Sequence, residues 1–163
     1  MVNLLETIWE YQQLVHKEES LGIELDEDEQ AKLLGLRRLL RGEYMGAVVP
    51  ERPERHEGST PIPVQFTEPG GFAIGEIRSL SANGIAIVTN RPPLEDTRTV
   101  LRVADPRRGW EYVFPGRVVW RKDRVIGVVF DGVPTRNPFL LPSDSWRPGR
   151  LRLGRGKRQP LVA

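Results

Sequence analysis

The segment from Ser79 to Gly84 holds the residues of this chain best suited to ligand chemistry. It reads Ser-Leu-Ser-Ala-Asn-Gly and leads directly into the strand-like run 85–88. A turn of this composition can place a serine hydroxyl and free backbone amides beside a phosphate or the edge of a base. Serine also caps local backbone groups and glycine tolerates positive φ, so the residues suit a plain turn between strands as well. The 79–84 turn is therefore a candidate binding site with a purely structural alternative.

Catalytic and metal-binding groups are sparse in the rest of the sequence. The chain has no cysteine, which excludes disulfides, thiol nucleophiles and zinc–thiolate sites. His16 and His56 each stand alone, without an acid or a second ligand at a suitable spacing. The acidic run 26–29 lacks the alternating oxygen ligands and central glycine of a calcium loop, and Ser81 has no histidine base in its segment. We therefore expect a protein that is not an enzyme and has no metal or other cofactor.

The formal net charge of +2 conceals two oppositely charged parts. Residues 1–50 contain 5 Lys or Arg against 10 Asp or Glu, whereas residues 51–163 contain 19 against 12. The second part is net basic, which favours anionic partners. The basic positions from Arg150 onward could contact nucleic acid or an acidic membrane, but they lack the interleaved aromatic residues that stack on bases.

The first 42 residues predict a helical hairpin. Helical spacing gives the first helix an apolar stripe of Leu4, Ile8, Tyr11 and Val15. Asp26 as N-cap, with Glu29 three residues later, forms a variant of the capping box and starts a second helix. This helix runs to about Arg41 and turns three leucines inward, Leu33, Leu36 and Leu40. Because neither helix can bury its stripe alone, a homodimer through the N-terminal helices is one expectation.

After a linker over residues 43–60, rich in Pro, Gly and charge, the pattern changes to a period of two. Six strands are predicted, near residues 61–67, 72–79, 84–89, 98–104, 110–121 and 125–131. Six short strands without an intervening helix indicate a small antiparallel β-barrel over residues 61–133. Residues 134–163 are predicted to be an irregular basic tail.

No apolar run is long enough to span a bilayer, and the N-terminus lacks the pattern of a signal peptide. We expect a soluble, cytoplasmic protein without a membrane span. Among the aromatic residues, Trp120 and Phe130 alternate with polar neighbours and are predicted core residues. Trp110 and Trp146 stand among polar residues and are candidate interface anchors.

The strand region resembles a PilZ domain, the bacterial receptor domain for cyclic di-GMP. The 79–84 turn and the strand after it are similar to the family's Asp/Asn-x-Ser-x-x-Gly motif. Residues 116–120 (Gly-Arg-Val-Val-Trp) and 125–130 (Val-Ile-Gly-Val-Val-Phe) resemble the family's last long hairpin, and residues 63–66 its first strand. The helical hairpin is similar to an N-terminal extension of some deltaproteobacterial members. The resemblance implies an α+β, mainly β protein: a six-stranded antiparallel PilZ-type β-barrel behind an α-helical hairpin.

The resemblance also implies a two-part ligand site. The family grips cyclic di-GMP with an Arg-x-x-x-Arg stretch before the first strand, because planar guanidinium groups bind phosphates and stack on guanines. The Asp/Asn-x-Ser-x-x-Gly turn adds contacts to the guanine edge. Carried onto this chain, the ligand-binding residues for cyclic di-GMP would be Arg52, Arg55, Ser79, Ser81, Asn83 and Gly84.

This chain departs from the family pattern in both halves of the site. Ser79 stands where the family has Asp or Asn, so only a weak hydroxyl acceptor remains. Arg52 and Arg55 are separated by two residues instead of three, and acidic residues lie between and beside them. We therefore predict a regulatory adaptor in bacterial motility, polarity or surface behaviour that works through protein contacts, with weak or lost cyclic di-GMP binding. The alternatives are a functional cyclic di-GMP receptor that uses the same residues and, second, a small-barrel nucleic-acid-binding protein.

Overall fold

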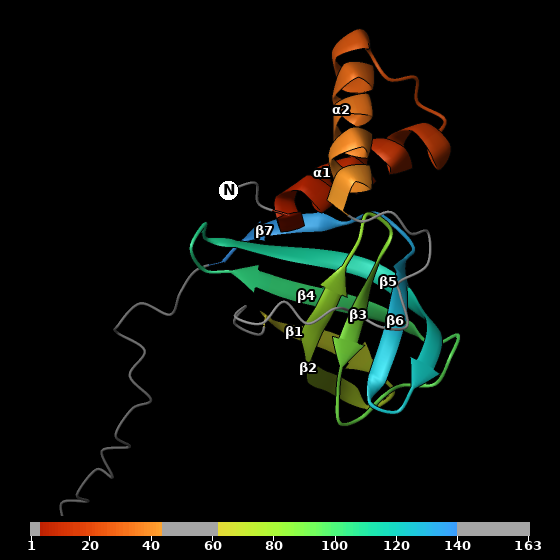
Figure 1. The fold of residues 1–163 in the computed structure, drawn as a ribbon, viewed down its shortest axis with the longest axis vertical. Helices are drawn as coiled ribbons and strands as arrows, with labels where there is room; N and C mark the ends of the chain where they lie inside the picture. Colours follow the sequence, from red (N-terminus) through yellow and green to blue (C-terminus); the bar gives the residue numbers. More distant parts are fainter. Residues whose placement is uncertain (1–3, 44–61, 140–163) are drawn as a thin grey trace, which may run out of the picture.

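The computed structural model describes residues 4–43 and 62–139, with side chains for 4–40 and 62–139 (Figure 1). Two helices come first in these ranges, α1 (Leu4–Glu19) and α2 (Glu27–Glu43). The strands that follow are β1 (Ile62–Glu68), β2 (Gly71–Leu80), β3 (Gly84–Val88), β4 (Arg98–Asp105), β5 (Trp110–Lys122), β6 (Val125–Phe130) and β7 (Thr135–Pro138).

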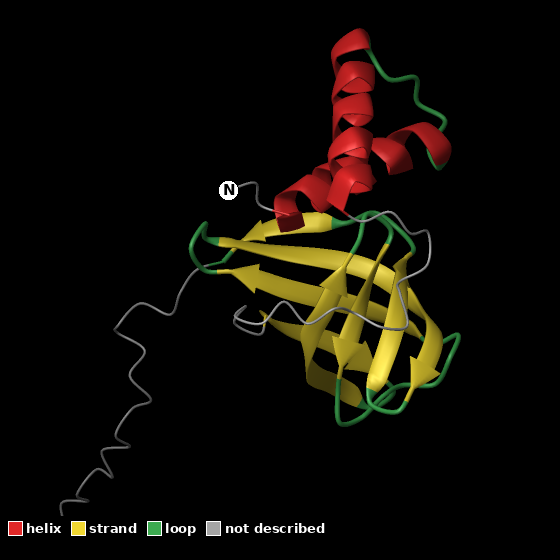
Figure 2. Cartoon of the chain, in the orientation of Figure 1, coloured by secondary structure: helices red, strands yellow, loops and turns green. Residues whose placement is uncertain are grey.

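Six of these strands form a closed antiparallel barrel (Figure 2). The sheet order is β4-β1-β2-β3-β6-β5, and the pairing of β5 with β4 closes it. Strand β5 has 13 residues and reaches three partners. Its first half pairs with β4 on one side and with β7 on the other, and its second half pairs with β6. The predicted fold class, a mainly β six-stranded barrel behind a helical hairpin, is confirmed.

The period-two pattern explains why the predicted strands form where they do. In β5, Tyr112, Phe114, Gly116 and Val118 are buried and alternate with half-buried neighbours. Such alternation puts one face of the strand in the core and the other toward solvent. The turn between β1 and β2 has Gly70 and Gly71 at φ 104° and 148°, a backbone region that other residues rarely adopt.

The prediction of an irregular tail over residues 134–163 is wrong at the start of that range. Thr135–Pro138 form β7, which pairs with residues 110–113 of β5. Four residues ending in a proline give almost no strand signal by themselves. The strand forms because the first half of β5 extends beyond β6 and offers an unpaired edge. Residues 140–163 lie outside the described part of the chain.

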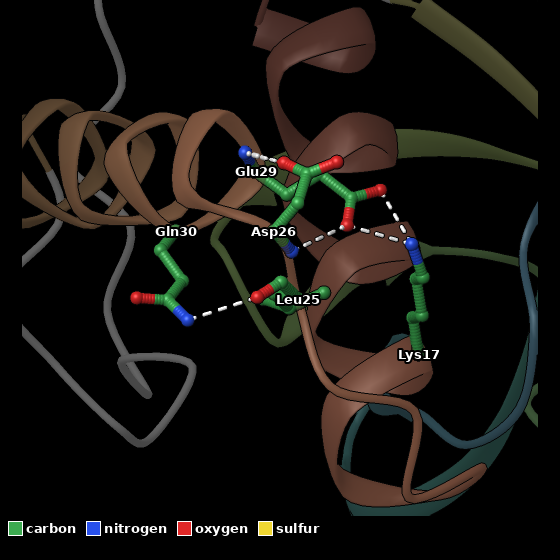
Figure 3. Close-up of polar contacts among 5 residues, drawn as sticks. All are labelled: Lys17, Leu25, Asp26, Glu29 and Gln30. Carbon is green, nitrogen blue, oxygen red and sulfur yellow. Dashed lines mark hydrogen bonds and ion pairs between the residues drawn. The ribbon is translucent and has the colours of Figure 1, made fainter.

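The predicted capping box starts α2 as expected (Figure 3). The Glu29 amide donates to Asp26 Oδ1 at 2.8 Å, and the Asp26 amide donates to Glu29 Oε2 at 3.2 Å. Lys17 of α1 donates to both carboxylate oxygens of Glu29 at 2.6 Å and so ties the two helices together. Helix α2 continues beyond the predicted end near Arg41 to Glu43. Neither described helix has the length and apolar character of a membrane span.

The buried face of α1 differs from the predicted stripe. Its buried residues are Leu5, Thr7, Ile8 and Gln12, whereas Leu4, Tyr11 and Val15 are only half-buried. Helix α1 is rotated about its axis relative to the prediction because it packs on the barrel as well as on α2. The polar side chains of Thr7 and Gln12 are therefore buried too. The inward leucines of α2, Leu33, Leu36 and Leu40, are buried as predicted.

The helices and the barrel share one hydrophobic core. Leu5 and Ile8 of α1 and Leu40 of α2 belong to the same cluster as barrel residues from β1 to β6. Figure 1 shows α1 lying across one end of the barrel, beside β7. The boundaries proposed from the sequence, at 42 and 61, therefore separate segments of the chain that pack as one body.

Ile8→Ala should lower the free energy of unfolding by about 2–5 kcal/mol, because it opens a cavity where the helix meets the barrel. Urea unfolding followed by far-ultraviolet circular dichroism measures this. Leu94→Ala is the control, since Leu94 is 71% exposed, and it should change the free energy by less than about 0.5 kcal/mol. If Ile8→Ala shifted only a helical phase and left the barrel transition in place, the shared core would not be cooperative.

Candidate functional site

The 79–84 turn is closed by its own serine. The Ser81 amide donates to the Gly84 carbonyl at 2.9 Å, and the Gly84 amide donates to Ser81 Oγ at 3.1 Å. The Ser81 hydroxyl is also 3.1 Å from the Gly84 carbonyl, to which it can donate. Its hydrogen-bonding capacity is thus used inside the turn. The structural interpretation of Ser81 and Gly84 accounts for both residues.

Ser79 occupies a different position, on the outer face of the barrel. The strand registers set Ser79 opposite Ala86, Ala86 opposite Gly127, and Gly127 opposite Trp120. The neighbouring residues Leu80, Ile85, Ile126 and Val128 are buried in the core, so this row faces outward. We call these four residues, Ser79, Ala86, Gly127 and Trp120, the outer row.

Trp120 is not the core residue that its sequence pattern predicted. The β5–β6 register shifts between Val118 and Trp120, and this irregularity moves Trp120 to the outer face. Its indole lies over Gly127, where a Cβ would collide with the ring. The predicted core role of Phe130 is correct in part: its ring is half-buried and stacks on Phe114 with centroids 4.7 Å apart.

Two polar atoms of the outer row are buried without a hydrogen-bond partner among the described residues. They are Ser79 Oγ and Trp120 Nε1, one acceptor-capable hydroxyl and one donor. An unsatisfied buried polar group costs about 1–3 kcal/mol, so a hydrogen bond to either atom would be stabilising. Between them, Ala86 is fully buried and Gly127 lies under the Trp120 indole.

Helix α1 reaches the 79–84 turn from the other side. The buried Gln12 side chain donates from Nε2 to the Ala82 carbonyl at 2.6 Å and lies 3.5 Å from Asn83 Oδ1. The Asn83 carbonyl accepts from the Phe130 amide at 2.8 Å. Gln12 was not predicted to take part in the site, because its contact with the turn is separated by 70 residues in sequence.

A cation–π sandwich holds α1 in this position. The Arg136 guanidinium lies 4.4 Å from the ring centroids of both Trp9 and Trp110. Glu6 of α1 pairs with Arg136 at 3.1 Å and also with Arg108. The Gln13 side chain donates to the Pro134 carbonyl. Trp110 is thus an anchor, as predicted, for the chain's own helix; Trp146 lies outside the described residues.

Tyr112 is buried beneath this sandwich, directly opposite Arg136 in the β5–β7 register. Burial and the Glu6 carboxylate raise the pKa of the Tyr112 phenol above its ordinary value, and the Arg136 charge opposes this in part. The phenol is therefore favoured in its neutral form in the folded protein.

Four of the six predicted site residues lie within the described chain: Ser79 is near the end of β2, Ser81 and Asn83 are in the turn after it, and Gly84 begins β3. Arg52 and Arg55 lie outside the described residues. Within residues 4–43 and 62–139 there is no cluster of His, Cys, Asp or Glu that could hold a metal ion.

Tyr112→Phe should flatten the dependence of stability on alkaline pH. The raised pKa means that the folded state keeps the phenolic proton longer than the unfolded state, so its contribution is complete below about pH 10. That contribution is lost as pH rises through the folded pKa, by up to about 1.4 kcal/mol per pH unit. Urea unfolding between about pH 9 and 11 measures the slope. Parallel slopes for wild type and variant would contradict the assignment.

Comparison with known proteins agrees with these features. The family model of the PilZ domain matches residues 51–138, more than half of the chain. No curated protein is significantly similar in sequence. One similar solved structure is a crystal structure of the PilZ domain of CeSA from a cellulose-synthesizing bacterium. It shares 19% identity over 45% of this chain and 76% of that chain, with a TM-score of 0.38. On the family match, the chain belongs to the PilZ domain family of cyclic di-GMP-binding regulatory domains.

Proposed function

We propose that this PilZ protein is a non-enzymatic regulatory adaptor that acts through protein contacts and binds cyclic di-GMP only weakly. The observation that carries the proposal is the state of the 79–84 turn. The turn keeps its shape, but the Ser81 hydroxyl and the Ala82 carbonyl are already engaged by the protein itself. We propose that the adaptor works in the cytoplasm, in bacterial motility, polarity or surface behaviour, on the strength of the signalling family to which it belongs.

We expect weak binding because few hydrogen-bonding groups of the turn remain free to contact a ligand. The Ser81 hydroxyl is used in closing the turn, and Gln12 already contacts the Ala82 carbonyl and the Asn83 side chain. Ser79 Oγ is unpaired among the described residues, but a hydroxyl is a weaker and shorter-reaching acceptor than the carboxylate or amide of the family motif. One free hydroxyl supports a weak contact to a guanine edge.

The outer row is where the ligand would rest under this proposal. Ala86 is fully buried and the Trp120 indole covers Gly127, so a guanine would reach Ser79 Oγ only after the indole moves, which also favours weak binding. Arg52 and Arg55 would supply the phosphate contacts from the preceding segment, as the family motif implies. With both arginines closely flanked by glutamates, part of their charge would be neutralised.

The coupling to protein partners would pass through α1. Gln12 contacts the turn, and the same helix is held on β5 and β7 by Arg136. A ligand or partner that changes the conformation of the turn would therefore change how α1 packs on the barrel. By linkage, a partner that prefers one position of α1 would change ligand affinity by the same factor.

Ser79→Asn should strengthen cyclic di-GMP binding by about tenfold, which corresponds to about 1.4 kcal/mol. The variant restores an amide acceptor at the position where the family has Asp or Asn. Isothermal titration calorimetry on the full chain measures the affinity of both proteins. Ser20→Asn is the matched control, because Ser20 is exposed between the two helices, and it should leave the affinity unchanged.

The same titration separates the adaptor from its alternative. Micromolar binding by the wild type that is abolished in both Arg55→Ala and Ser81→Ala would show a functional receptor and overturn the weak-binding proposal. Absence of heat for wild type and Ser79→Asn alike, with both folded by circular dichroism, would show that the ligand site has been lost altogether.

A further inference from the structure

The exposed face of α2 is unlike an ordinary solvated helix surface. One side of α2 buries Leu33, Leu36 and Leu40, and the end that begins at Glu27 points away from the barrel (Figure 1). On the other side, Leu34 and Leu39 are 56% and 54% exposed. At 100° per residue, these two leucines flank the line that faces away from the buried stripe. The residues in the middle of this exposed line are small.

The small residues are Ala31 and Gly35, one turn apart and both exposed. A Cβ at Gly35 would meet no atom of the described residues within 4 Å, so nothing in that part of the chain requires a glycine there. Glycine inside a helix costs about 1 kcal/mol relative to alanine. Small residues flanked by leucines allow a second helix to approach closely, with the leucines closing over its sides.

The two ends of this face carry opposite charges, so the face is complementary to a reversed copy of itself. Asp28 is exposed in the first turn of α2 and Arg38 is exposed near its end. Ten residues apart, they are about 15 Å from each other along the axis and cannot pair within one helix. In an antiparallel pair centred between Ala31 and Gly35, Ala31 meets the partner copy's Gly35 position and Asp28 meets its Arg38 position. The two-fold axis repeats each contact.

We propose that the protein forms a symmetric homodimer in which the exposed faces of two α2 helices, Asp28 to Leu39, pack antiparallel. The occupant is a second copy of this chain, because the acidic end of this face matches the basic end of the same face on an antiparallel copy. The barrels then lie at opposite ends of the pair. The dimer does not rest on the adaptor proposal and can be tested without ligand.

Light scattering after size exclusion, over a concentration series of the full chain, should show twice the mass of one chain. Gly35→Leu should give a monomer, because the side chain blocks the close approach while leucine favours the helix. Its helical circular dichroism should be undiminished, which separates a lost interface from a lost fold. A wild type that stays monomeric at the highest concentration, or a Gly35→Leu variant that still dimerises, would overturn the proposal.

Charge reversal tests the antiparallel register. Asp28→Arg and Arg38→Asp should each weaken the dimer, because each brings like charges together across the two-fold. The double variant should restore it, and so should an equimolar mixture of the two single variants. Since residues 28 and 38 are too far apart to pair within one chain, only contact between copies explains a rescue. Glu18→Arg, an exposed change on α1, is the control and should leave the mass unchanged. Failure of both rescues would exclude this register.

Discussion

The position of α1 depends on the Arg136 guanidinium between Trp9 and Trp110. Arg136 is on β7, Trp110 on β5, and Trp9 and Glu6 on α1, so one side chain joins three elements. The Arg136 charge lies between two indole rings and pairs with the Glu6 carboxylate, and both interactions stabilise it where little water is present. With α1 fixed here, Ile8 enters the core and Gln12 reaches the 79–84 turn.

This arrangement makes the turn part of the interface between α1 and the barrel. In the family, the motif supplies polar groups to a ligand; in this chain, Ser81 and the Ala82 carbonyl are bound internally. The outer row retains unpaired polar atoms, Ser79 Oγ and Trp120 Nε1, among the described residues. The structure therefore combines a closed barrel with a turn that is held by α1.

Much of the fold could be predicted because its signals are local. The alternation in β5, the glycines at 70 and 71 and the Asp26–Glu29 capping box each act within a few residues. The 79–84 turn was found for the same reason. Trp120 was assigned to the core from its alternation with polar neighbours. That assignment is wrong because a one-residue register shift in β5 reverses the alternation, and such a shift has no signature in the sequence.

The sequence by itself determined the barrel strands, the start of α2 and the residue types of the turn, since these follow from neighbours along the chain. Only the tertiary structure decided β7, the buried face of α1 and the partners of the turn. Strand β7 exists because β5 offers an edge, and α1 turns Gln12 inward because the barrel lies beneath it. Contacts between residues 70 or more positions apart, such as Gln12 with Ala82, depend on closure of the whole barrel and have no local signal.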